Sequence, residues 1–134
     1  MSLQTWEEEF YPEPAEEAAE RGEAAAVEHS LRKWEGLRYE NLNRHGMWAS
    51  STLAREFNTG RGLELSGETC ALCELSLRSV ESCGICPLFK ARGGSACDRR
   101  GFDETESPWN SWTDDRDPEP MIFWLKKAKE HCND

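Results

Sequence analysis

Two cysteine pairs with the spacing of metal ligands lie in the middle of this 134-residue chain. Cys70 and Cys73 form the first pair, Cys83 and Cys86 form the second, and nine residues separate the two pairs. Each pair can present two sulfurs to one ion, and two pairs complete the tetrahedral set of thiolates that structural zinc requires. The spacing therefore predicts a zinc site within residues 66–97, with these four cysteines as ligands.

A fifth cysteine, Cys97, leaves the ligand set open. It is a spare thiol, a replacement for one member of a pair, or the sign of an iron–sulfur cluster, which cysteine thiolates also bind. We favour zinc held by the two pairs and keep Cys97 as the alternate ligand. Cys132 is interpreted as incidental. His45 is a candidate ligand from outside the cluster, but we interpret it as a cation at the C-terminus of a helix.

The second pair also permits a redox interpretation, because a CxxC motif at a helix start can stabilise a thiolate. Thioredoxin-like proteins place that motif in a strand–helix context, and residues 79–82 do not have the composition of a buried strand. The first ten residues are acidic, whereas a secretory signal begins with basic and then apolar residues. We therefore expect a reducing cytoplasm, where paired cysteines are metal ligands more often than disulfides.

Charge and length limit the classes of protein to which the chain can belong. Twenty-six acidic and 16 basic residues give a formal net charge of −10, which opposes a broad nucleic-acid-binding face. Residues 1–40 carry eleven acidic and four basic residues, so most of the excess negative charge lies in the N-terminal third of the chain. No apolar run approaches the roughly 18 residues of a membrane span. We predict an extended acidic arm over residues 1–14 and a single zinc-stabilised domain over residues 15–134.

The apolar pattern predicts a mainly helical fold. Residues 15–44 are expected to form one long helix or two short ones, with Val27, Leu31, Trp34 and Leu37 on one apolar face. The outer half of this segment, residues 16–26, has almost no apolar side chain larger than alanine, so we expect it to be solvated, projecting or partly frayed.

Further helices are predicted toward the C-terminus. A weaker helical segment is expected over residues 47–57, and a closing helix follows Asp117, where a capping carboxylate precedes proline. Trp109 and Trp112 lie in a polar connection that should fold back on the core. Alternating apolar runs are few, so any sheet should be small and near the metal. The predicted fold is a compact helical domain stapled by zinc, with small α+β content possible at the metal site and an acidic N-terminal arm or helix.

The sequence contains no motif that names a reaction. HExxH, the zinc-deaminase pattern, the Walker loop, GxSxG and the dinucleotide fingerprint are all missing. An all-thiolate zinc site is closed, whereas a catalytic zinc keeps an open position. We therefore predict a protein without catalytic activity.

Several motifs together resemble small uncharacterised proteins encoded by bacteriophages and prophages. The resemblance covers about residues 30–130, and its motifs are the two cysteine pairs with Pro87 and Leu88 after the second, then Cys97, residues 107–109 (Ser-Pro-Trp) and the helix start over residues 117–125. It implies an accessory protein of the host bacterial cytoplasm and no particular mechanism. The acidic N-terminal segment before residue 30 is not part of the resemblance.

Three functional hypotheses follow. The sequence favours a non-catalytic zinc-binding accessory protein that binds another protein. A second hypothesis is an acidic nucleic-acid mimic, in which the glutamates between Glu7 and Glu28 enter a basic groove of a host or defence protein; the alternative is a solvated helix face. A third is direct nucleic-acid binding through four basic residues near the cysteines, with tryptophans stacking on bases, which the net charge opposes. These four residues are Lys90, Arg92, Arg99 and Arg100.

Overall fold

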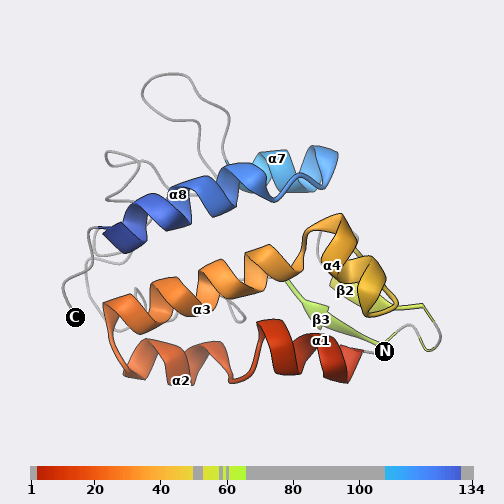
Figure 1. Cartoon of the computed structure of the whole chain (residues 1–134), viewed down its shortest axis with the longest axis horizontal. Helices are drawn as coiled ribbons and strands as arrows, with labels where there is room; N and C mark the ends of the chain where they lie inside the picture. The colour runs from red at the N-terminus through yellow and green to blue at the C-terminus, as the bar shows by residue number, and fades with distance from the viewer. Residues whose placement is uncertain (1–2, 50–52, 58, 60, 66–107, 131–134) are drawn as a thin grey trace.

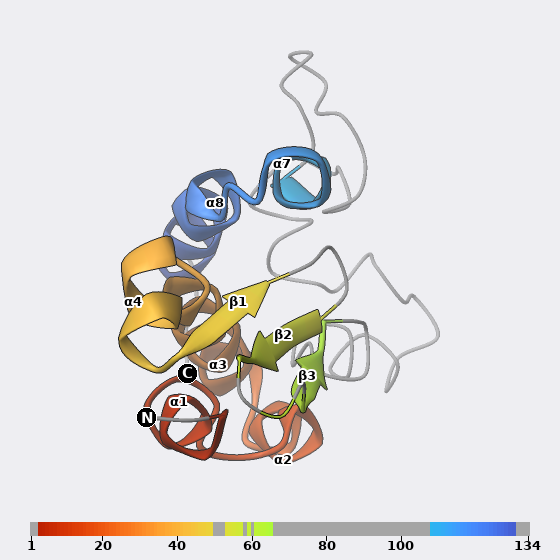
Figure 2. The same cartoon turned by 90° about the vertical axis from the view of Figure 1, so that its right-hand side faces the viewer.

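The computed structural model describes residues 3–49, 53–57, 59, 61–65 and 108–130, which form a layered arrangement of helices with one small sheet (Figures 1 and 2). The elements, in chain order, are α1 (Leu3–Phe10), α2 (Ala15–Glu20), α3 (Glu23–Gly36), α4 (Tyr39–Arg44), β1 (Met47–Ala49), β2 (Leu53–Glu56), β3 (Gly62–Glu64), α7 (Pro108–Asp115) and α8 (Glu119–Glu130). Helices predominate among these elements, which confirms the mainly helical class with a small sheet.

Helix α3 is central to the packing. Figure 1 shows α8 along one side of α3, and α1 and α2 end to end along the other. The predicted apolar face of α3 is buried, from Val27 to Leu37. Trp34 meets two rings of α7 edge to face, with centroid distances of 6.2 Å to Trp109 and 5.4 Å to Trp112. The prediction that the tryptophans pack on the core is confirmed for Trp112, which is fully buried, and residues 108–115 around it form helix α7.

The segment predicted as one or two helices over residues 15–44 contains three. Gly22 separates α2 from α3 with φ of 109°, a left-handed conformation that favours glycine. The expectation of a solvated half over residues 16–26 is wrong, since Ala18, Ala19 and Ala26 are buried. Small side chains let α2 approach α3 closely, so alanine here marks a packed helix face rather than an exposed one.

The segment predicted as an extended arm is instead helix α1. Leu3, Trp6 and Phe10 recur at helical spacing and are buried on one face of this helix. Gln4 and Glu8 lie on the exposed side. The two prolines that suggested an extended arm, Pro12 and Pro14, follow the helix and form its connection to α2.

A three-stranded antiparallel sheet, with strand order β1-β2-β3, occupies the region where a helix over residues 47–57 was predicted. Gly46, with φ of 67°, ends α4 and turns the chain into β1. Met47 and Ala54 are buried on the inner face of the sheet, whereas Trp48 and Arg55 pair across β1 and β2 on the outer face. Period-two alternation within strands of three or four residues is too short to distinguish from a helical turn.

Helix α8 begins as the sequence predicts. The backbone N–H of Glu119 donates to Asp117 Oδ1 at 3.1 Å, and the following face of α8 is buried. The buried residues of this face are Met121, Ile122, Leu125 and Ala128.

Replacing Asp117 with alanine removes this cap and should lower the free energy of unfolding by about 1 kcal/mol. Asp117→Asn keeps an acceptor oxygen at the same place and serves as the matched control. Urea unfolding followed by circular dichroism measures both variants. Equal midpoints for the two variants would contradict a role of the side-chain oxygen in capping.

Candidate functional site

The predicted metal ligands lie in a part of the chain that the structure does not describe. This applies to Cys70, Cys73, Cys83 and Cys86, to the alternate ligand Cys97, and to Cys132. Among the residues that are described, no group of three or more histidine, cysteine, aspartate or glutamate side chains is arranged to hold a metal ion. The zinc site therefore stays a prediction from cysteine spacing.

His45 is the one candidate ligand that the structure does describe, and it contacts α1. Its side chain is 4% exposed, and Nδ1 lies 2.9 Å from Thr5 Oγ1, while Nε2 lies 2.8 Å from Glu9 Oε1. Both ring nitrogens are thus engaged within the fold. His45 is the C-terminal cap residue of α4, the position that the sequence interpretation gives it.

Further polar contacts join α1 to the rest of the protein, in addition to those with His45. The Trp6 indole N–H donates to the Gly36 carbonyl at 2.8 Å, and the Leu3 backbone N–H donates to Glu56 Oε2 at 2.8 Å. Arg44 donates to Glu9 Oε2 at 2.8 Å, beside the His45 contact. Hydrogen bonds from Arg44 and then His45 lower the pKa of Glu9, and the bond from Leu3 lowers the pKa of Glu56. These contacts join α1 to α3, α4 and β2.

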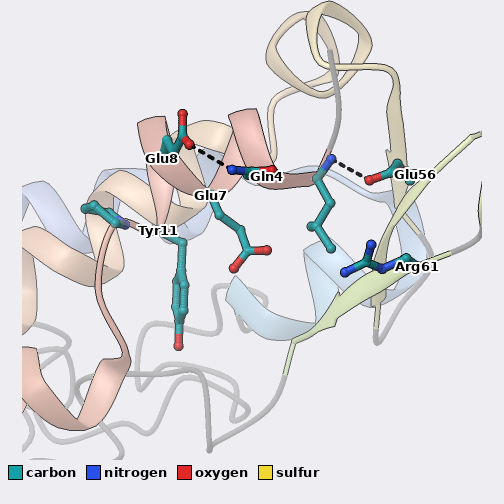
Figure 3. A pocket seen from close by; sticks show the side chains of 8 residues that line it. Gln4, Glu7, Glu8, Tyr11, Glu56 and Arg61 are labelled. Atoms are coloured by element: carbon teal, nitrogen blue, oxygen red, sulfur yellow. Dashed lines mark hydrogen bonds between the residues drawn. The ribbon is translucent and has the colours of Figure 1, made fainter.

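A polar pocket of about 500 Å³ lies between α1 and the β2–β3 hairpin. Figure 3 shows the Glu7 side chain directed into it, with Tyr11 on one side and Arg61 on the other. Burial raises the pKa of Glu7, and the positive charge of Arg61 opposes that shift. Because three of its eight lining residues are glutamates (Glu7, Glu8 and Glu56), this pocket suits a polar group rather than an apolar ligand.

Several acidic residues of the N-terminal segment form ion pairs with basic residues. Glu9 pairs with Arg44, Glu13 with Arg21, and Glu28 with Lys129 at 2.7 Å. Other acidic residues of this segment, such as Glu8 and Glu17, are exposed. A nucleic acid presents an uninterrupted row of negative charge, so this alternation is a poor imitation of a phosphate backbone.

The outer face of the sheet and the turn directly after β2 carry exposed aromatic side chains that the sequence did not reveal. Trp48 is 41% exposed and Phe57 is 62% exposed. The Arg55 guanidinium lies 5.9 Å from the centre of the Trp48 ring. The signal in the sequence was alternation of buried and exposed residues along β1 and β2, which an assignment to helix conceals.

The lowered pKa of Glu9 predicts a pH effect on stability. A carboxylate with a lowered folded-state pKa adds stability above its ordinary pKa of 4.5, and this contribution disappears as the pH falls through the lowered value. In Glu9→Gln, the free energy of unfolding should fall less than in wild type between about pH 7 and about pH 3. The effect should be modest, because the Glu9 side chain is 41% exposed and solvent screens its charge.

Denaturant titrations at the two pH values test this prediction. Glu8→Gln removes a neighbouring exposed carboxylate of α1 and controls for the change in net charge. An identical acid loss in wild type and Glu9→Gln would show that the contacts of Glu9 do not supply pH-dependent stability.

Comparisons with protein-family models, curated proteins and solved structures find no match for this chain. None of the helices in the described part of the chain is both long and apolar enough to cross a membrane. The functional assignment therefore depends on the chemistry of the chain's own residues.

Proposed function

We propose that this chain is a non-catalytic, zinc-stabilised accessory protein that acts by binding another protein. The observation that carries the proposal is the exposure of Trp48 on the outer sheet face and of Phe57 in the turn directly after β2, although both side chains could be buried with gain of free energy. Tryptophan, tyrosine and arginine are enriched among residues that dominate binding energies at protein interfaces. Arg55 holds its guanidinium over Trp48, which adds a polar donor beside the aromatic surface.

The zinc part of the proposal rests on the spacing of Cys70, Cys73, Cys83 and Cys86. A structural zinc site supplies folding free energy on the order of 10 kcal/mol, which suits a chain of this length. A site with four thiolate ligands has no open coordination position for a substrate. An iron–sulfur cluster is the alternative cofactor for the same ligands.

The non-catalytic part is supported by the roles of three described acidic groups. Glu9, Glu56 and Glu119 owe their lowered pKa values to hydrogen bonds that join secondary-structure elements. General acid–base catalysis needs such groups aimed at a substrate rather than at the fold. The motifs resembling phage and prophage proteins add the proposal that the chain works in the host bacterial cytoplasm.

Capture of partners from a bacterial lysate tests the proposal. The bait is the tagged full chain, and the test variant is Trp48→Ala combined with Phe57→Ala. The control combines Tyr39→Ala with Phe123→Ala, because these aromatic residues are 79% and 52% exposed elsewhere on the surface. We expect a protein that wild type and control retain and the test variant loses. Equal retention by all three, or no retained protein at all, would contradict the proposal.

The same capture experiment and a gel shift test the two alternative functions. Partners of an acidic mimic should be basic nucleic-acid-binding proteins that dissociate when the salt concentration is raised. A gel shift with single-stranded and double-stranded probes tests direct binding through Lys90, Arg92, Arg99 and Arg100, all of which lie outside the described residues. A shift at micromolar protein would favour that alternative.

A further inference from the structure

Helix α1 docks into the body as a self-contained unit. Leu3, Trp6 and Phe10 occupy positions i, i+3 and i+7, the spacing with which short amphipathic helices fill grooves of binding partners. Trp6 is fully buried, and its indole N–H donates to the carbonyl of Gly36 on α3. Polar contacts at both ends of α1 reach Glu56 of β2 and His45 beyond α4.

The connection between α1 and α2 suits an opening movement. It consists of residues 11–14 and includes Pro12 and Pro14, of which Pro14 is extended with φ of −61° and ψ of 148°. Figure 1 shows α1 and α2 following one another along the same side of α3, so the chain does not reverse between them. Proline interrupts helices, so this segment can change direction without breaking either helix.

The surface of α3, α4 and β2 on which α1 docks is called the α1 groove. We propose that α1 can leave the α1 groove of its own chain and occupy the α1 groove of a second copy, so that two chains form a dimer by exchanging α1. In such an exchange, the contacts of Trp6, Glu9 and Leu3 form again with the same partner residues on the other chain. A short tether gives docking within one chain an effective concentration on the order of millimolar. The monomer is therefore the main species at low concentration, and exchange becomes dominant when docking within one chain is obstructed.

Gly36 provides the means to obstruct docking selectively. A Cβ atom at this buried position would lie 2.4 Å from Phe10 Cγ and 2.6 Å from Phe10 Cβ. Gly36→Ala therefore blocks the groove against an α1 that carries Phe10. Phe10→Gly removes the obstructing side chain, and it lies at the last residue of α1, where glycine is well tolerated.

Mixing the two single variants tests the exchange. In a mixed dimer, α1 of the Phe10→Gly chain fits the blocked groove of the Gly36→Ala chain. In return, α1 of the Gly36→Ala chain, which keeps Phe10, fits the unchanged groove of the Phe10→Gly chain. We expect each variant alone to be mainly monomeric and the mixture to give a 1:1 heterodimer, with about twice the 15.3 kDa mass of one chain, by native mass spectrometry. A mixture that stays monomeric would overturn the proposal.

Two further variants keep the test decisive. The chain with both Gly36→Ala and Phe10→Gly combines a blocked groove with an α1 that fits it, so it should remain monomeric. Deleting residues 12 and 13 shortens the tether by roughly 7 Å and leaves every docking residue unchanged. If either single variant fails to fold, this deletion decides: a dimer in light scattering supports exchange, and a folded or partly folded monomer overturns it.

Discussion

Trp6→Ala should lower the free energy of unfolding by about 3–5 kcal/mol, the cost of truncating a large buried aromatic side chain. Trp6 has no exposed surface, packs against Phe10 with a ring-centroid distance of 5.9 Å, and donates to the carbonyl of Gly36. The variant loses the packing and also leaves that buried carbonyl without its donor. Chemical denaturation followed by far-ultraviolet circular dichroism measures the change.

The matched control is Trp48→Ala, which truncates an exposed tryptophan on the sheet. Its free energy of unfolding should change by no more than about 1 kcal/mol, because Trp48 is 41% exposed whereas Trp6 has no exposed surface. A loss of the same size in both variants would contradict the burial of α1, and with it the groove on which the exchange of α1 depends.

Of the changes considered, removal of the proposed zinc ion should lower the stability of this protein most. A structural zinc site contributes on the order of 10 kcal/mol to folding, and a typical domain is stable by only about 5–15 kcal/mol. We therefore expect a zinc chelator at neutral pH, or the substitution Cys73→Ser, to abolish the cooperative unfolding transition. Calorimetry before and after chelation measures this loss.

Two further cysteine variants identify the ligand set. Cys132→Ser should leave zinc content and the unfolding temperature unchanged, and Cys97→Ser should do the same if the two pairs are the ligands. Loss of zinc in Cys97→Ser with retention in one of the pair variants would assign Cys97 as a ligand instead. An unfolding transition that survives chelation unchanged would contradict a structural metal.

Capping residues and apolar periodicity in the sequence correctly predicted the helices that contain these signals. Helix α8 combines a capping aspartate, prolines in the first turn and an apolar face over two turns, so its start and its buried side are both correct. The α3 face from Val27 to Leu37 is equally periodic and is buried as predicted. Trp112 was placed in the core because a large aromatic side chain in a polar connection gains most by packing inward.

The remaining elements depend on contacts that no local window contains. Glu9 and His45 meet although 36 residues separate them, and Trp6 reaches Gly36 across 30 residues. The strands of the sheet are too short for alternation to outweigh helical propensity. The zinc site at the cysteine pairs stays a prediction from ligand spacing, which is itself a local signal. The exposure of Trp48, by contrast, depends on which side of β1 and β2 faces the core.

The proposed zinc site of the cysteine pairs is best tested by elemental analysis of protein purified without added metal, read together with thiol titration before and after chelation. We predict one zinc ion per chain, with four of the six thiols unreactive until the chelator is added. Six reactive thiols in folded, metal-free protein would contradict the account, and iron with visible absorbance would replace zinc by a cluster suited to electron transfer.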